Sequence, residues 1–374
     1  MDANTTELID NLSLDLWDDA SSEAFESDSE PESDWEMGPE LLHVFKTSLK
    51  LPLNKSDKAA KIANGIRQYF AALTKERAGC LSFDLWSVLD KITSQIPHDS
   101  ELHDVLADAF KIIEQEGGPV WLDADGKSPF LWSWDQLPGL GIYTREFFDT
   151  PQNDWSSSQM AQRRNYGSFL ASLEKRNIVG SLMTVWEFLE ALEGGKGPSK
   201  EGNEALRGPA MQTNLCMVRD RIVISGQEIF NHLRHMAAQD APEYMIIPYQ
   251  PGVLCDGQTN SYFSLSRWLF WKQRLSQIRD EQLNELGLVE DEVVPIINET
   301  LDRMEAIESG AGPIEGDNWP KLLDHNKDDA KNDGKQKRDV EGKQDNEKNV
   351  RFEEETHADQ KAVSGGWFFS CVVS

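Results

Sequence analysis

Hydrophobic residues recur at helical spacing along most of the central part of the chain. The densest example is residues 264–279, which contain neither Gly nor Pro and begin with Ser264, a residue type that caps helices. At 100° per residue, Leu265, Trp268, Trp271, Leu275 and Ile278 form one broad apolar arc. Phe270 points nearly the opposite way from Trp268, and a surface helix needs apolar side chains on one face only. We therefore expect this helix to lie between neighbours, with Arg267, Lys272 and Arg274 directed outward or paired.

The same period predicts most of the remaining structure. It indicates helices over residues 57–76, 82–96, 100–116, 159–177, 179–193, 205–233 and 293–308. Ser56, Ser82 and Ser100 are the expected caps of the first three, and Gly117-Gly118 ends the third. Residues 119–128 read as a connection, residues 130–148 as a turn followed by a helix, and residues 236–262 as a long loop. Strand-like alternation is rare and short. The fold class is therefore all-α, with a single multi-helix domain over residues 41–308.

Charge separates both ends of the chain from this domain. The net charge is -28, and residues 1–40 hold fourteen Asp and Glu with no Lys or Arg. We expect residues 1–40 to be a disordered acidic segment and residues 309–370 a disordered charged tail. Apolar residues spaced among the acids, among them Leu8, Ile9, Leu12 and Leu14, allow two readings of the first segment. It is a short partner-binding motif that folds on contact, or it is a solubilising tail.

The same charge limits the classes of partner. Nonspecific nucleic-acid binding needs basic charge to displace counterions, and so does unaided adhesion to an anionic membrane. Cys80, Cys216, Cys255 and Cys371 form no CxxC pair, and the amino terminus is acidic instead of resembling a signal peptide. No run approaches eighteen apolar residues, so no membrane-spanning helix is expected. We expect a cytoplasmic protein that binds no nucleic acid.

Few residues form a pattern that carries chemistry. His232 and His235 lie three apart on a helix, but no third ligand follows at a strong spacing, so we expect no metal site. Glu187, Glu190 and Glu193 lie at i, i+3 and i+6, and a solvated helix face explains them better than a general acid–base pair. Phosphate-loop, dinucleotide-binding and nucleophile-elbow motifs are absent from the sequence. We therefore predict no catalytic residues and no cofactor.

Several stretches resemble a fungal all-helical family, DUF3632, which is known only as a domain of unknown function. The similar pieces are Leu131-Trp132 with Leu137-Pro138, Gly141 and Arg145-Glu146; Phe169 with Leu173; Trp186 with Ala191-Leu192-Glu193; Arg267-Trp268 with Phe270-Trp271-Lys272 and Arg274; and Met304 with Ile307-Glu308. Together they cover most of residues 56–308, and no single piece is specific alone. The resemblance implies a soluble helical domain and a fungal source, and it implies no activity.

The last four residues carry the sharpest functional signal. Cys371-Val372-Val373-Ser374 fits the C-a-a-X prenylation pattern, and a terminal Ser indicates a farnesyl group. The modifying partner would be a farnesyltransferase. A single lipid gives only marginal, reversible membrane binding, at about 0.8 kcal/mol per buried CH₂. No polybasic cluster stands upstream, so we expect weak membrane association.

Two functions remain open at this point. The first is a non-enzymatic interaction protein, cytoplasmic with a membrane-associated fraction on the cytosolic face, whose protein partner is unknown. The second is a small-molecule-binding or enzymatic accessory protein of a fungal secondary-metabolism pathway, because some family members are similar to accessory genes near such clusters. This second function needs a concave pocket. The candidate pocket residues are Trp132, Arg145, Trp186, Trp268 and Arg274.

Overall fold

A computed structural model shows the chain as a packed set of helices. It describes residues 3–14, 38–73, 81–121, 132–149, 155–180, 182–194, 207–236, 250–255 and 264–310. All of these residues belong to one compact unit, Met1–Asp317. The predicted disordered tail and Cys371 lie outside the described residues, as do parts of the predicted loop over 236–262.

The all-α fold class is confirmed. The α-helices are α1 (Ala3–Asn11), α2 (Gly38–Lys50), α3 (Lys55–Ala71), α5 (Leu81–Gln95), α6 (Leu102–Glu116), α7 (Leu140–Asp149), α8 (Ser157–Lys175), α9 (Leu182–Leu192), α10 (Gly208–Met236), α12 (Leu265–Gln277) and α13 (Glu290–Gly310). The described residues also form shorter helical turns. These are η1 (Trp134–Gln136) before α7, η3 (Val253–Cys255) before α12, and a π-helical turn, η4 (Ile278–Gln282), which extends α12. No helix among the described residues is long and apolar enough to cross a membrane.

The described strands are confined to one small ladder, which the sequence pattern does not predict. β1 (Pro119–Trp121) lies in the expected connection and pairs in an antiparallel arrangement with β2 (Trp132–Ser133), which lies in the segment predicted as a turn followed by a helix. Gly117, at φ 57°, ends α6 as expected and turns the chain towards β1. The ladder therefore closes a hairpin beside α6 and leaves the helical core unchanged.

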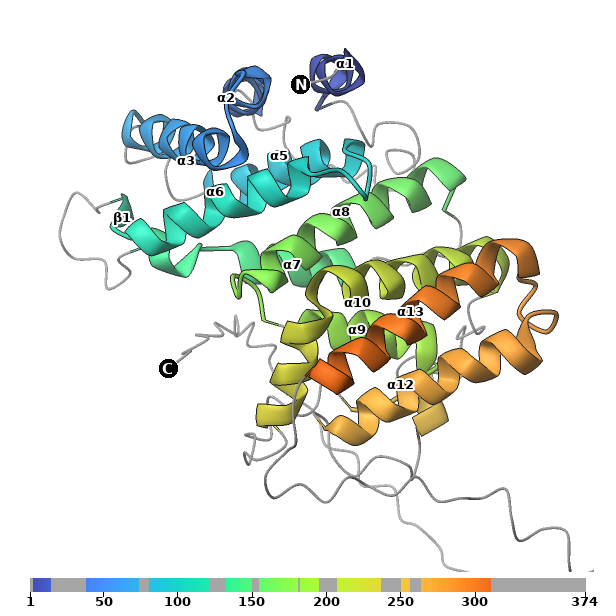
Figure 1. The fold of residues 1–374 in the computed structure, drawn as a ribbon. Coiled ribbons are helices and arrows are strands. Elements are labelled where there is room, and N and C mark those ends of the chain that lie inside the picture. The colour runs from blue at the N-terminus through green and yellow to red at the C-terminus, as the bar shows by residue number, and fades with distance from the viewer. Residues whose placement is uncertain are drawn as a thin grey trace, which may run out of the picture. The chain divides into compact units, whose positions relative to one another are not determined.

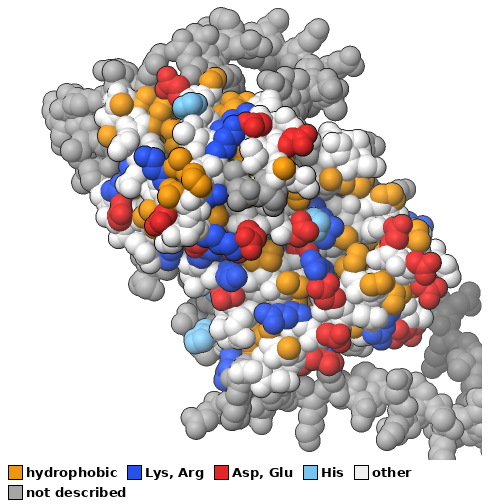
Figure 2. Space-filling model, turned by 45° about the horizontal axis from the view of Figure 1, so that its top comes forward, with side chains coloured by type: hydrophobic (Ala, Val, Ile, Leu, Met, Phe, Trp, Pro, Cys, Tyr) orange, Lys and Arg blue, Asp and Glu red, His pale blue; other side chains and the backbone are white. Residues whose placement is uncertain are grey.

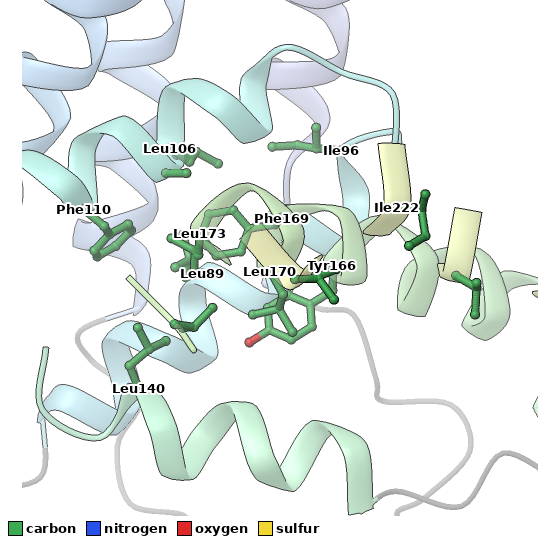
Figure 3. Packing of buried hydrophobic residues seen from close by; sticks show 14 of the residues in the cluster. Leu89, Ile96, Leu106, Phe110, Leu140, Tyr166, Phe169, Leu170, Leu173 and Ile222 are labelled. Carbon is green, nitrogen blue, oxygen red and sulfur yellow. The ribbon is translucent and has the colours of Figure 1, made fainter. Parts of the chain in front are cut away.

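The helices lie in successive layers (Figure 1). α1, α2 and α3 lie at one end of the unit and pack on α5 and α6, which are followed by α8. α8 packs on α10, and α10 contacts α9, α12 and α13 at the other end. Figure 3 shows how α8 fills the middle, with Tyr166, Phe169, Leu170 and Leu173 directed into the space between α5, α6 and α7.

The chain start departs from the prediction. Residues 3–11 form α1, and Ile9 and Leu12 are 0% and 2% exposed within the hydrophobic core. The expectation of disorder is therefore wrong for residues 3–14, whereas residues 15–37 lie outside the described residues. Leu8 and Ile9 on the helix, and Leu12 and Leu14 directly after it, are covered by a surface of the same chain.

Two predicted helix ends are also corrected. Asn54 caps α3, because its side chain accepts the backbone N–H of Asp57 at 2.9 Å, and the predicted Ser56 lies inside the first turn. Ser264 precedes α12 as expected, but its side chain makes no capping hydrogen bond; its Oγ contacts the Oγ of Ser266 at 2.6 Å. Helix ends depend on which of several nearby polar side chains reaches the free N–H groups, and sequence spacing does not decide this.

The prediction for residues 264–279 is confirmed in its main point. Trp268 and Trp271 are both 0% exposed, and Phe270 on the other side is also buried. Trp268 packs edge-on against Phe230 of α10 at 5.1 Å between ring centroids. Trp271 packs edge-on against Phe188 of α9 at 4.7 Å. α12 thus lies between neighbours, and its basic side chains are paired as described below.

Candidate functional site

α9 carries buried charge where the sequence predicts a solvated face. Residues 184–189 and 191–193 are buried, and only Glu190 in this stretch is exposed. Glu187 and Glu193 are 1% and 0% exposed. The solvated-face interpretation is therefore wrong for these two, because α9 is packed against α7, α10 and α12 and has little free circumference. A carboxylate in such a position needs a cation or several hydrogen-bond donors.

Glu193 receives those donors from α12. The Nε of Arg267 donates to Oε1 at 2.5 Å and its second guanidinium nitrogen donates to Oε2 at 2.8 Å. The indole N–H of Trp271 donates to Oε1 at 2.6 Å. Arg267 is itself 0% exposed, so this is a fully buried, two-pronged ion pair. It joins the end of α9 to the face of α12 that the sequence predicts to be apolar.

The same carboxylate fixes a loop segment. The backbone N–H of Gly252 donates to Oε2 at 2.8 Å, and the backbone N–H of Leu254 donates to the main-chain oxygen of Glu193 at 3.0 Å. A Cβ on residue 252 would lie 2.3 Å from that oxygen, so only Gly fits there. Glu193, Arg267, Trp271, Gly252 and Cys255 are called the Glu193 cluster below.

A second buried cluster joins α8, α9 and α10. Glu174 accepts hydrogen bonds from Thr184 at 2.8 Å and from Ser225 at 2.6 Å. Arg221 donates from Nε to Glu187 at 3.1 Å, and its guanidinium also lies 3.7 Å from Glu174. All five side chains are at most 2% exposed. We call these residues the Arg221 cluster.

A third contact joins α12 to α13. Glu308 accepts the indole N–H of Trp268 and the ammonium of Lys272, both at 2.9 Å. Residues that carry the family resemblance thus meet in space: Glu193 binds Arg267 and Trp271, and Glu308 binds Trp268 and Lys272. These motif residues connect neighbouring helices. Structural contacts therefore account for Arg267, Trp268, Trp271 and Lys272 of α12.

The buried ionisable groups are poorly suited to nucleophilic chemistry. Burial, followed by the negative charge of Glu193, raises the pKa of the Cys255 thiol well above its ordinary value. Burial likewise raises the pKa of Cys216 and of Glu187. A reactive thiol needs a lowered pKa, so these two thiols are disfavoured as nucleophiles. The two clusters and the contact at Glu308 are consistent with a structural role.

One carboxylate outside the clusters titrates near neutrality. Asp90 of α5 accepts hydrogen bonds from the hydroxyl of Tyr143 of α7 and from Ser94, each at 3.0 Å. Burial raises its pKa to about 6, although both hydrogen bonds and the charge of Lys91 act to lower it. Burial, followed by the charge of Asp90, also raises the pKa of Tyr166 well above its ordinary value. Asp90 therefore links two helices through a group whose charge changes at mildly acidic pH.

The five predicted pocket residues lie in different settings. Trp268 is fully buried, and Trp186 on α9 is 8% exposed. Arg274 on α12 donates a hydrogen bond to Gln282 at 2.6 Å, and Arg145 on α7 is exposed. Trp132 lies in β2, and its side chain is outside the described residues. α9 and α12 contact each other, so Trp186, Trp268 and Arg274 lie on neighbouring helices. A ligand pocket around these residues stays a prediction.

The structure describes one concave surface elsewhere, between α2 and α3. It is an open depression of about 520 Å³, lined by Pro39, Glu40, His43, Val44, Gly65, Gln68 and Tyr69. None of the predicted pocket residues lines it. Within the described ranges, no group of three or more His, Cys, Asp or Glu side chains could hold a metal ion. His232 lies in α10, and His235 bonds the main-chain oxygen of Asn231 at 2.7 Å.

The Glu193 and Arg221 clusters are largely missed by the sequence pattern. Arg221, Glu174 and Ser225 stand out only as polar residues on the apolar arcs of α8 and α10, and such residues are usually assigned to helix edges. Glu187 and Glu193 are singled out, but for the wrong environment. Their signal would be the presence of Arg267 inside the Trp-rich segment, since a buried cation requires a buried anion.

Comparison with known proteins assigns part of the chain to a protein family. Residues 86–275 match the family described as "Protein of unknown function (DUF3632)". This range runs from α5 to α12 and contains the Glu193 and Arg221 clusters. No curated protein and no solved structure matches the chain.

Proposed function

The chain belongs to the DUF3632 family of proteins of unknown function, and within it we propose a non-enzymatic interaction protein that a farnesyl group on Cys371 brings reversibly to the cytosolic face of a membrane. The observation that carries the proposal is the sequence Cys371-Val372-Val373-Ser374. A prenyltransferase needs a thiol four residues before a free carboxylate, with two aliphatic residues between them. The proposal therefore requires the free carboxylate to be on Ser374.

The lipid would act as a weak anchor. One isoprenoid chain gives reversible binding, and stable attachment needs a second chain or a basic segment. Residues 353–355 are three glutamates, which an anionic leaflet repels. Trp367, Phe368 and Phe369 are the aromatic residues closest to Cys371 and can add interfacial contact. The proposed association is accordingly switchable, and a protein partner is needed to make it last.

The described part of the chain supports the non-enzymatic side of the proposal. Its buried carboxylates Glu174, Glu187 and Glu193 are held by donors from neighbouring helices, whereas a catalytic group must reach a substrate. The face in Figure 2 carries acidic and basic side chains among scattered hydrophobic ones, as protein surfaces ordinarily do.

Mass spectrometry of the intact protein tests the modification. The chain is expressed in a fungal host, chosen for the family resemblance, with an amino-terminal tag that leaves Cys371 near a free end. We expect loss of the last three residues and addition of a farnesyl group. Ser374→Leu is the matched control, because a terminal Leu directs geranylgeranyl to the same thiol. An unmodified thiol in both forms contradicts the proposal.

Fractionation tests the consequence. The wild-type chain should divide between soluble and membrane fractions, and Cys371→Ser should move it to the soluble fraction. Ser374→Leu should increase the membrane share, because the longer lipid buries more CH₂ groups. If the distribution is the same for all three chains, the lipid does not determine location.

A further inference from the structure

We propose that the surface formed by α2 and α5 is a binding site for a short amphipathic helix with an acidic last turn, that α1 occupies this site within the chain, and that a partner's helix of the same chemistry displaces α1. The inference deepens the proposed interaction function by giving the partner's chemistry. It does not depend on farnesylation, because every contact involved lies in residues 3–14, 38–50 and 81–95.

Apolar contacts hold one face of the segment. Ile9 and Leu12 are 0% and 2% exposed, and both belong to the core cluster that includes Leu41 and Phe45 of α2. Leu8 and Leu14 are partly buried against the same cluster. A Cβ on Gly38 would lie 2.7 Å from the side chain of Leu14, so the first residue of α2 is small where the segment crosses it. The site therefore recognises apolar residues at helical spacing.

Main-chain contacts hold the end of the segment. The side chain of Gln95 accepts the backbone N–H of Ser13 at 2.9 Å and donates to the main-chain oxygen of Ser13 at 2.7 Å. Lys91 donates to the main-chain oxygen of Leu14 at 2.8 Å. Any residue except Pro can offer the same backbone groups, so this part of the site tolerates changes in the bound sequence.

Positive charge selects the acidic last turn. Lys46 donates to the main-chain oxygen of Asp10 at 2.9 Å, and Lys50 forms an ion pair with the carboxylate of Asp10. The last turn of a helix presents unpaired carbonyl oxygens and the negative end of the helix dipole. A helix that lies beside α2 as α1 does (Figure 1) therefore presents its last carbonyl groups to Lys46, and an acidic side chain at the position of Asp10 to Lys50.

The hold on α1 is weak enough for exchange. Among residues 3–14 only Ile9 and Leu12 are fully buried, and the side chains of Lys50 and Asp10 are 38% and 54% exposed, so salt screens their pair. A nine-residue helix is not stable by itself in water. α1 and α2 belong to the same chain, so the contact between them is intramolecular and a partner helix must compete with it. A partner helix with larger apolar residues can compete, because it would bury more apolar surface on the site.

The test uses the full chain and a fluorescent peptide with the sequence of residues 3–14. In the double variant Ile9→Asp/Leu12→Asp, α1 no longer covers the site. We expect this variant to bind the peptide about tenfold or more tightly than the wild-type chain, in which the tethered α1 competes. Asn4→Asp is the matched control, because it adds a charge to an exposed position of α1 and should leave peptide binding at the wild-type level. Adding Gln95→Ala to the double variant should weaken peptide binding.

Two results would overturn the proposal. The first is equal peptide affinity in the wild-type chain and the double variant. The second is loss of the cooperative thermal melt in the double variant, since α1 would then be a permanent part of the core. Hydrogen exchange on the wild-type chain gives an independent reading: amides of α1 should exchange roughly a hundredfold faster than those of α5, and equal protection of the two helices also refutes displacement. None of these outcomes depends on whether Cys371 carries a farnesyl group.

Discussion

At the scale of single residues, the most informative feature is the unusual amount of charge placed inside this helical unit. Arg163, Arg221 and Arg267 are each at most 2% exposed. Burying a charge is costly, and a buried ion pair is seldom the most stabilising choice for its volume. Removing one partner is a different matter, because the remaining charge is left without compensation.

Glu193→Gln measures this asymmetry. The substitution keeps the size of the side chain and leaves Arg267 buried without an anion, so we expect the free energy of unfolding to fall by about 3–5 kcal/mol. Urea unfolding measures the change. The matched control is Glu285→Gln, at an exposed position, where a change within about 0.5 kcal/mol is expected. A loss below about 1 kcal/mol for Glu193→Gln would show that the pair is well solvated.

Asp90 gives a prediction about pH. Its pKa is about 6 when folded and 3.8 without the protein environment. The folded state therefore binds the proton more tightly, and the stability that Asp90 contributes is greatest below pH 4 and falls as the pH rises to about 6. The fall amounts to roughly 3 kcal/mol at 1.36 kcal/mol per pKa unit. Ser94, Tyr143, Lys91 and Tyr166 surround the group.

The variant Asp90→Asn should remove that fall. Its free energy of unfolding, measured in urea between pH 4 and pH 7, should exceed the wild-type value at pH 7 and show a smaller decrease across this range. Glu187, whose pKa is also raised, acts equally in both chains. Parallel curves for the two chains would mean that Asp90 stays ionised throughout.

The limits of sequence reasoning are clearest at Glu187, Glu190 and Glu193. All three have the same residue type and a regular spacing, yet only Glu190 is exposed. Which carboxylates are buried depends on how many helices surround α9, and this is a property of tertiary packing. The buried aromatic residues of α12 are predictable because apolar area on two sides of a helix has one physical explanation.

At the scale of elements, the contact between α10 and α13 depends on one missing side chain. α10 continues through Gly226 without a break. A Cβ on residue 226 would lie 2.7 Å from the Cδ1 of Ile307. The helix therefore tolerates Gly in its interior because Ile307 fills the space, even though Gly weakens an isolated helix by about 1 kcal/mol relative to Ala.

A double-mutant cycle tests this contact. Gly226→Ala alone should destabilise the chain or give less than the helix-propensity gain, because Ile307 must move. In a background of Ile307→Val, which lacks Cδ1, Gly226→Ala should be stabilising by about 1 kcal/mol. Thermal unfolding of the four chains gives the coupling energy, expected at about 1 kcal/mol or more. Additive effects would show that the two residues do not interact.

Helices and their order could be predicted well, whereas their exact ends could not. The period of apolar residues reports burial of a face, and this holds for α5, α6, α8, α10, α12 and α13. The ends follow hydrogen bonds such as that of Asn54 to Asp57, for which several nearby residues compete. α1 could not be predicted because its helix depends on the surface of α2 and α5, whose hydrogen bonds to this segment come from residues 36 to 82 positions further along the chain.

At the scale of the whole molecule, the family match is shorter than the packed unit. Residues 86–275 include α12 but leave out α3 and α13. α3 packs on α6, and its apolar residues Ala59, Ile62, Ala63, Ile66 and Phe70 are buried. α13 packs on α10 and supplies Glu308 to α12. The matched range is therefore not expected to be an independent folding unit.

Two fragments test this expectation. A chain of residues 38–310 should melt cooperatively, whereas residues 86–275 should show helical content without a cooperative transition, because the apolar faces of α6, α10 and α12 lose their cover. Circular dichroism during heating measures both. A cooperative melt of residues 86–275 would place the folding unit within the matched range.

The reactivity of the Cys255 thiol reports opening motions of residues 250–255, the loop segment beside α9. Its side chain is 0% exposed, and its thiol donates a hydrogen bond to Glu193. An alkylating reagent can reach that sulfur only while residues 250–255 move away from Glu193. The rate at which the reagent alkylates Cys255, measured by mass spectrometry of peptides, therefore reports how often the segment opens. Gly252→Ala should raise this rate, because the added Cβ forces the backbone away from Glu193.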